Sequence, residues 1–294
     1  MARHFLTGAE LSADELRALI DRALELKAQP LSSDALAGRS VALIFQKPST
    51  RTRLSFEVGV DELGGHPVVL RADELQLSRG ETVRDTALVL SRHVAAIGVR
   101  TGPDEFLAEL AEYATVPVFN MLTADHHPCQ ALADLLTLRE EFGHLEGLTL
   151  AYVGDGNNVA RSLAIVGAIA GVKVRIASPT GFEIEPVAGA ELFTDPAEAV
   201  AGADAVYTDV WVSMGSAEDD PGRASALAPY RIDDALLARA APHAIALHCL
   251  PAHVGEEITA EVLYGARQRI WDQVENRRHA QKALLELLVE PEVG

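Results

Sequence analysis

The most concentrated set of polar side chains lies at 47–53, which reads Lys-Pro-Ser-Thr-Arg-Thr-Arg. It follows an apolar run at 40–45, and Ser49 or Thr50 is a suitable N-cap for a helix that starts here. The free backbone N–H groups and the positive end of that helix would face an anion. A capped helix with solvated arginines is the simpler interpretation. So many polar groups directly after a buried strand nevertheless favour an anion site.

Polar residues also follow two later apolar runs in the first half of the chain. Arg100 comes directly after 94–99, although a lone arginine at such a place is usually a surface ion pair. His126 and His127 precede Pro128, which suits the first turn of a helix. Adjacent histidines suggest a metal, but both rarely reach one ion, and no partner has ligand spacing. The better interpretation is that a histidine and Gln130 act as hydrogen-bond donors, and a polar helix cap is the alternative.

The loop at 154–158, Gly-Asp-Gly-Asn-Asn, imitates the first part of the dinucleotide fingerprint G-x-G-x-x-G. Val159 replaces the third glycine, and the next strand candidate ends at Ala177-Ser178 without the ribose-binding acid. A nicotinamide cofactor is therefore disfavoured. Asn157 and Asn158 suit the polar head of an amino acid, although a turn with positive φ would favour the same residues.

Two further polar groups end strand candidates in the second half. Asp209, with Ser213-Met214-Gly215 shortly after it, could hold an ammonium group. Cys249 lies in His248-Cys249-Leu250-Pro251 at the end of the last strand. A buried cysteine is usually a small apolar residue. A cysteine at a strand's carboxyl end beside a histidine is nevertheless a functional candidate.

The elements that must position these residues alternate between strand and helix. This order predicts an α/β fold with parallel sheets covered on both sides, whose ligands bind at the carboxyl ends of the strands. A break at 143–147 divides the chain into two such units, 1–140 and 141–274, followed by a helical segment at 275–294. Strands are expected at 40–45, 67–70, 94–99, 117–120, 148–153, 172–177, 205–210 and 244–250.

Length and charge bound the function. The 294 residues suffice for about two domains of roughly 150 residues each. The formal net charge of −18 argues against a nucleic-acid partner and against binding to a membrane surface. The sequence shows no signal-peptide core and no apolar run of about 18 residues, and its two cysteines form no disulfide framework. We therefore expect a cytoplasmic protein.

Together these motifs resemble those of the aspartate/ornithine carbamoyltransferase family. The run 49–57, Ser-Thr-Arg-Thr-Arg-Leu-Ser-Phe-Glu, is similar to the family's carbamoyl-phosphate signature. His127-Pro128-Cys129-Gln130 is similar to its second signature, and the pieces keep the family's order over essentially the whole chain. Asp209, Ser213-Met214-Gly215 and His248-Cys249-Leu250-Pro251 look like the ornithine branch.

The resemblance implies an activity. The enzyme would transfer the carbamoyl group of carbamoyl phosphate to the δ-amine of L-ornithine and release citrulline and phosphate, in arginine biosynthesis or, in reverse, in arginine breakdown. The family uses no cofactor, and no metal is expected. The resemblance also implies a homotrimer with sites between subunits, and a C-terminal helix that returns to the first domain.

The resemblance assigns the carbamoyl-phosphate site residue by residue. The phosphate would be bound by Ser49, Thr50, Arg51 and Thr52, and Arg277 matches a further arginine of this site. The carbamoyl end would be bound by Arg100, His127 and Gln130, with Arg100 also near the phosphate. Gln76 matches a residue that the family lends to the neighbouring subunit's site.

The ornithine site follows from the second half. Its α-amino and α-carboxylate groups would be held by Asn158, Asp209, Ser213 and Met214. Cys249 and Leu250 would border the δ-amine and the carbamoyl group. The residues expected to take part in catalysis are Arg51, Arg100, His127, Asp209 and Cys249.

Two departures from the family pattern lie where no chemistry is assigned. Gln46 stands where many relatives have Glu, and the loop 121–126 reads Met-Leu-Thr-Ala-Asp-His instead of the commoner pattern. A carbamoyltransferase-like binding protein is the non-catalytic alternative, although every motif position holds a competent residue. N-acetylornithine and putrescine are alternative acceptors, and Asp209 with the Ser-Met-Gly loop favours a free amino acid.

Overall fold

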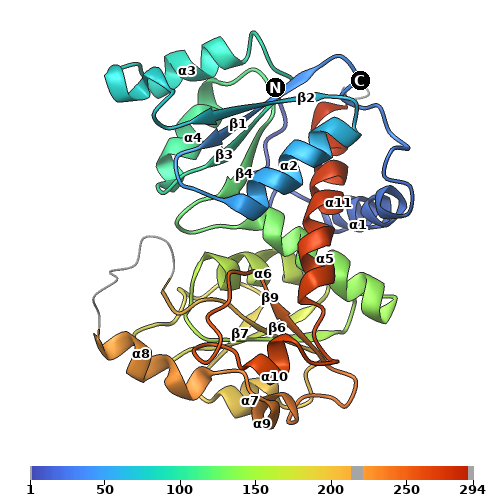
Figure 1. Ribbon diagram of the computed structural model, residues 1–294, viewed down its shortest axis with the longest axis vertical. Coiled ribbons are helices and arrows are strands. Elements are labelled where there is room, and N and C mark those ends of the chain that lie inside the picture. Colours follow the sequence, from blue (N-terminus) through green and yellow to red (C-terminus); the bar gives the residue numbers. More distant parts are fainter. Residues whose placement is uncertain (1, 213–220, 291–294) are drawn as a thin grey trace. The chain divides into compact units, whose positions relative to one another are not determined.

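The computed structural model describes residues 2–212 and 221–290, which form two compact units (Figure 1). Unit 1 contains Met1–Leu136 and Glu275–Gly294, and unit 2 contains Thr137–Val274. The chain passes between the units twice, within α5 (Pro128–Phe142) and within α11 (Ile270–Val289). Unit 1 is therefore discontinuous in sequence.

Unit 1 is built on a four-stranded parallel sheet in the order β2-β1-β3-β4. Its strands are β1 (Ser40–Phe45), β2 (His66–Arg71), β3 (Ala96–Arg100) and β4 (Val118–Leu122). Strands β1 and β3 are buried along almost their whole length, which explains their continuous apolar runs. The carboxyl ends of β1 and β3 lie side by side, with Phe45 paired to Arg100.

Helices flank this sheet (Figure 1). They are α1 (Ala13–Ala28), α2 (Thr50–Glu62), α3 (Val83–Leu90), α4 (Asp104–Tyr113), the first part of α5, and the part of α11 from Glu275. Leu107 and Leu110 of α4 share a core with Ile44 and Val99 of the strands. Phe56 of α2 packs on Phe119 of β4 with ring centroids 5.1 Å apart.

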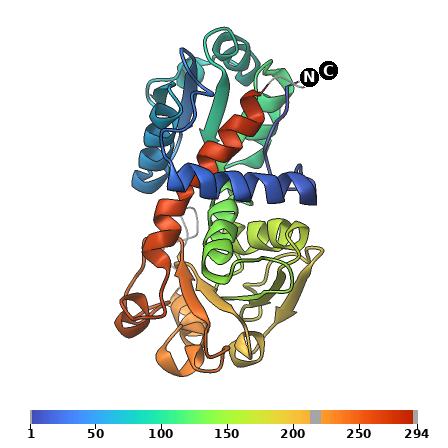
Figure 2. The ribbon, with the colours of Figure 1, turned by 90° about the vertical axis from the view of Figure 1, so that its right-hand side faces the viewer.

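The C-terminal helix α11 crosses α1 in unit 1 (Figure 2), and buried polar contacts fix it to α1 and α2. Lys282 is fully buried, and its Nζ donates to Leu26 O (3.3 Å), Pro30 O (3.0 Å) and Glu62 Oε2 (2.6 Å). Lys27 of α1 donates to Asn276 Oδ1 (2.8 Å). These contacts fix the register of α11, which carries the predicted site residue Arg277.

Unit 2 is built on a five-stranded parallel sheet in the order β7-β6-β5-β8-β9. The strands are β5 (Thr149–Val153), β6 (Lys173–Ala177), β7 (Ala190–Phe193), β8 (Ala205–Thr208) and β9 (Ile245–His248). The helices include α6 (Asn158–Ile169), α7 (Pro196–Val200), α8 (Pro221–Leu227), α9 (Asp234–Leu237) and α10 (Ala260–Leu263). Its core joins Val153, Val206 and Ala246 of neighbouring strands.

The predicted fold class is confirmed: two parallel sheets flanked by helices, with the C-terminal helix packed on the N-terminal domain. Several predicted ends were wrong. The strand predicted at 94–99 begins at Ala96, because the Val94 N–H donates to Leu90 O (3.1 Å) in the turn after α3. The last two predicted strands end early, at Thr208 and His248. In the part of the chain that the structure describes, no element was predicted from the sequence at α3, α4, α8, α9, α10 or β7. Among the described residues, no helix has the length and hydropathy needed to cross a bilayer.

Candidate active site

The first signature forms the loop after β1 and the start of α2. Ser49, one of the two residues predicted as candidates, is the N-cap, and its Oγ accepts the Thr52 N–H (3.2 Å). Thr50 is the first helical residue, and Arg51 follows it half-buried. The unpaired N–H groups of a first helical turn attract anions, and the positive end of the helix dipole adds to that attraction.

Arg277 joins α11 to the two helices that carry the other signature residues. Its Nη2 donates to Thr52 Oγ1 (2.6 Å), and its Nη1 donates to Gln130 Oε1 (2.7 Å). Gln130 in turn donates from Nε2 to Asp134 Oδ1 (2.8 Å). All four side chains are buried. The network therefore brings together residues more than 200 positions apart in sequence, which no local pattern could pair.

His127 is buried among guanidinium groups. Burial lowers the pKa of its imidazole well below the usual range, and the charges of Arg277, Arg100 and Arg51 lower it further. The ring is therefore neutral at pH 7. Arg100, only 5% exposed, ends β3 beside β1. We call Arg51, Arg100 and Arg277, whose charges act on the neutral His127, the cation cluster, and all four residues were predicted site residues.

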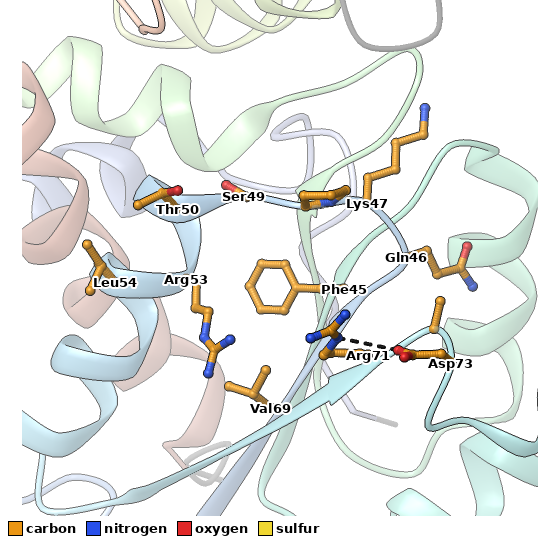
Figure 3. A pocket seen from close by; sticks show the side chains of 12 residues that line it. Phe45, Gln46, Lys47, Ser49, Thr50, Arg53, Leu54, Val69, Arg71 and Asp73 are labelled. Carbon is orange, nitrogen blue, oxygen red and sulfur yellow. Dashed lines mark ion pairs between the residues drawn. The ribbon is translucent and has the colours of Figure 1, made fainter.

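A cavity of about 500 Å³ adjoins this end of α2 (Figure 3). Ser49 and Thr50 line it together with apolar side chains, among them Phe45 and Val69. Two arginines at its wall are already paired, Arg53 with Glu57 (2.8 Å) and Arg71 with Asp73 (3.3 Å). Gln76 is exposed on the short helix η1 (Gln76–Arg79), where Arg79 donates to its Oε1 (3.5 Å).

Unit 2 carries a second cluster around Asp209, the residue after β8. Cys249 Sγ donates to Asp209 Oδ1 (2.9 Å), and Asn157 Nδ2 donates to Oδ2 (2.7 Å). Asn157 is also the N-cap of α6, since its Oδ1 accepts the Val159 N–H (3.0 Å) and the Ala160 N–H (3.2 Å). Asn158, the residue we predicted to bind ligand, is the first residue of α6 and half-buried. We call Asn157, Asp209 and Cys249 the Asp209 cluster.

Asp155 is a second buried carboxylate in unit 2, and the sequence analysis gave it no role. Burial raises its pKa to about 6; Arg223 lowers the value and Asp209 raises it again. Arg223 forms an ion pair with Asp155 and also donates to the Trp211 carbonyl. The position of Asp155 in the Gly-rich loop after β5 was a signal that could have singled it out. No signal in the sequence pointed to Arg223, because its ion pair with Asp155 depends on the tertiary fold.

The residues 248–251 form a fixed turn after β9. The Leu250 N–H donates to His248 Nδ1 (2.8 Å), so His248 Nε2 carries the proton that bonds to Glu257 Oε1 (3.0 Å). Leu250 adopts a left-handed φ of 58°, which is rare for a residue other than glycine. One ring nitrogen of His248 lies within 4.8 Å of a carboxylate oxygen of Asp209 and of Cys249 Sγ. Because both of its ring nitrogens are engaged, this set does not form a ready metal site. The predicted residues Ser213 and Met214 lie outside the described residues.

Comparisons with known proteins identify the family of the chain. The family model "Aspartate/ornithine carbamoyltransferase, carbamoyl-P binding domain" matches residues 3–140, and "Aspartate/ornithine carbamoyltransferase, Asp/Orn binding domain" matches 146–288. The ornithine carbamoyltransferase of Acidothermus cellulolyticus is 53% identical, with 100% of this chain and 99% of that protein covered.

Solved structures are similar over the same extent. The ornithine carbamoyltransferase of Thermus thermophilus has a TM-score of 0.92 and 44% identity, and covers 99% of this chain and 100% of its own. The ornithine carbamoyltransferase of Pyrococcus furiosus has a TM-score of 0.93 and 44% identity, with 98% and 97% covered. The chain belongs to the aspartate/ornithine carbamoyltransferase family.

Proposed function

We propose that this protein transfers the carbamoyl group of carbamoyl phosphate to the δ-amine of L-ornithine and produces citrulline and phosphate. The observation that carries this proposal is the cation cluster near the start of α2. A local concentration of positive charge stands out in a chain whose net charge is −18. The full-length likeness to ornithine carbamoyltransferases supports the choice of acceptor.

The phosphate end of carbamoyl phosphate binds at the start of α2. Ser49, Thr50 and Thr52 contribute hydroxyl and backbone N–H groups there, and Arg51 contributes a guanidinium. Arg277, already bonded to Thr52, adds a second cation. Positive charge at this place stabilises phosphate as it leaves, because negative charge accumulates on it in the transition state.

The carbamoyl end binds at His127, Arg100 and Gln130. A neutral imidazole carries one N–H, which His127 donates to the carbamoyl oxygen. Arg100 places a positive charge beside the same oxygen, which becomes negative as the carbon becomes tetrahedral. Because these donors are buried and fixed before substrate binds, little reorganisation is needed during the reaction.

Ornithine binds at the Asp209 cluster, where the carboxylate of Asp209 accepts hydrogen bonds from its α-ammonium. Asn158 and, by resemblance, Ser213 and Met214 hold the rest of the amino-acid head. Cys249 and Leu250 border the δ-amine. This amine loses one proton to solvent before it attacks. Its nitrogen then bonds to the carbamoyl carbon, the carbon–oxygen bond to phosphate breaks, and the leaving phosphate takes up the second proton.

The proposal includes a homotrimer in the cytoplasm. Gln76 is exposed on η1. A residue that reaches into a neighbouring subunit's site must be exposed in the isolated chain. The cavity beside Ser49 and Thr50, with its apolar floor, offers room for a segment of another copy (Figure 3). Neither cysteine forms a disulfide and both are buried, which suits a reducing compartment.

The test is product formation from carbamoyl phosphate with ornithine, N-acetylornithine, putrescine, lysine and aspartate as acceptors. We expect citrulline from ornithine and no product from the others. Product from another acceptor would refute the assignment of the Asp209 cluster but retain the carbamoyl-phosphate site. A folded protein that binds carbamoyl phosphate and forms no product would favour the non-catalytic alternative. Sedimentation measures the trimer independently.

A further inference from the structure

The loop that leads into His127 is fastened by its own backbone. The Thr123 N–H donates to His126 O (2.9 Å) and closes a turn, and the Ala124 N–H donates to Gly102 O (2.6 Å). On the far side, His127 O accepts the Gln130 N–H (3.1 Å) in the first turn of α5. The peptide that carries the His127 ring is thus held from both directions.

One carboxylate, that of Asp104 at the start of α4, accepts three hydrogen bonds from this loop. Its Oδ1 accepts hydrogen bonds from Thr123 Oγ1 (2.8 Å) and from His126 Nδ1 (2.7 Å). Its Oδ2 accepts the Asp125 N–H (3.1 Å). Burial raises the pKa of Asp104, but hydrogen bonds from His126 and Thr123 outweigh burial and leave the pKa below its usual value. The carboxylate is therefore ionised at neutral pH, when its bonds are strongest.

The two adjacent histidines thus have separate environments. His126 is directed to Asp104, and His127 lies buried beside the three arginines of the cation cluster. The loop 121–126, which departs from the commoner family pattern, supplies three of the groups bonded to Asp104. We propose that Asp104 and His126 are positioning residues that hold the His127 ring where it meets the carbamoyl oxygen. This inference rests on the proposed function.

The physical reason is that the rate of the reaction is sensitive to small displacements of a hydrogen-bond donor. A hydrogen-bond donor shifted by about 1 Å can lower the rate by about 100-fold. The phosphate end of the substrate has its own ligands on α2, at a different place in the chain. Loosening the 123–127 loop should therefore slow carbamoyl transfer and leave phosphate binding unchanged. A role limited to stability would lower both or neither.

The kinetic test uses three test variants and one control variant of the whole chain. His126→Ala and Asp104→Ala should each lower kcat about 10- to 100-fold. Their Kd for inorganic phosphate, measured by calorimetry, should stay within about twofold, because the ligands on α2 are intact. His126→Asn should recover most of kcat, because its amide N–H can replace Nδ1–H as the donor to Asp104. His93→Ala, at an exposed position in the same unit, is the matched control.

A second test needs no activity. Diethyl pyrocarbonate modifies accessible neutral imidazoles, and mass spectrometry gives the rate at each histidine. His127 should be protected in the wild type and modified at least several-fold faster in His126→Ala and Asp104→Ala. An inactive wild type would refute the proposed function. The modification rates would still test whether Asp104 and His126 hold His127 in place. Three results would each overturn the inference. The first is a wild-type kcat in His126→Ala. The others are a loss of phosphate binding in parallel with kcat, or continued protection of His127 in the variants.

Discussion

Arg277 illustrates how single residues gain a role from distant partners. It bonds to Thr52 and to Gln130, and its charge helps to keep His127 neutral. Removing the guanidinium would cancel one cation of the site and leave two buried polar groups without their donor.

We therefore expect Arg277→Met to lower kcat/KM for carbamoyl phosphate by at least about 100-fold, the loss seen when an oxyanion-stabilising donor is removed. Arg278→Met is the control, because this neighbour pairs with Glu62 and Glu275 instead. Steady-state kinetics of both variants, with circular dichroism to check the fold, makes the comparison. Equal losses in the two variants would mean that α11 as a whole had been disturbed.

Asp209 is the corresponding residue in unit 2. Its two oxygens accept hydrogen bonds from Cys249 and Asn157, so the carboxylate is held in one orientation. Asp209→Asn replaces an acceptor by a donor and removes the charge that an ammonium group requires. The KM for ornithine should rise by about 10- to 100-fold, the range for losing a hydrogen bond to a charged group. The Kd for carbamoyl phosphate should stay unchanged. Asp233→Asn, a helix N-cap in the same unit, should leave both values near wild type.

At the scale of elements, β3 depends on the absence of a side chain at Gly98. A Cβ there would lie 2.4 Å from ring atoms of Phe119 in the neighbouring strand β4. Since β3 ends in Arg100, its packing positions part of the cation cluster.

Gly98→Ala should lower the free energy of unfolding by about 1–3 kcal/mol, the usual effect of overpacking a core. The double variant Gly98→Ala/Phe119→Leu should recover part of that loss, because the smaller side chain makes room. Urea unfolding of wild type, both single variants and the double variant measures the coupling. Additive losses would show that the contact with Phe119 is not the cause.

The elements also show what the sequence could and could not predict. Strands such as β1 and β5 are buried on both faces, so an unbroken apolar run identified them. The N-cap at Ser49 was readable because the acceptor lies three residues from its donor. Asn157 was predicted to lie near the site, but its bond to Asp209 joins residues 52 positions apart and no local pattern shows it. The resemblance assigned ligand binding to Asn158. Asp104 and Arg223 were missed for the same reason: their partners are close only after folding.

At the scale of the whole molecule, acid stability depends on the buried histidine of α11. Burial lowers the pKa of His279 to about 4, and the charges of Lys282 and Arg278 act in the same direction. In the unfolded chain a histidine has a pKa of about 6.5. Between these two values the unfolded chain binds a proton that the folded chain does not, so stability falls as pH falls through this window.

His279→Gln removes that proton and should flatten this part of the pH profile. The wild type should lose more free energy of unfolding than the variant between pH 7 and pH 4.5, measured by urea unfolding at each pH. His93→Gln, at an exposed site, is the control. Parallel profiles for wild type and His279→Gln would show that other groups account for the acid sensitivity.

The discontinuity of unit 1 has a consequence for how the chain matures on the ribosome. Unit 2 is one continuous stretch, so all of its residues have been synthesised before Glu275 is added. Unit 1 starts first, but its segment from Glu275 on follows only after all of unit 2 has been synthesised, at roughly 5–20 residues per second. Until then Leu26, Pro30 and Glu62 lack the amine of Lys282, and Thr52 lacks Arg277. The nascent protein therefore cannot join Arg277 to Thr52 before all of unit 2 has been synthesised, and a chain that stalls before Arg277 should bind carbamoyl phosphate less tightly than the released protein.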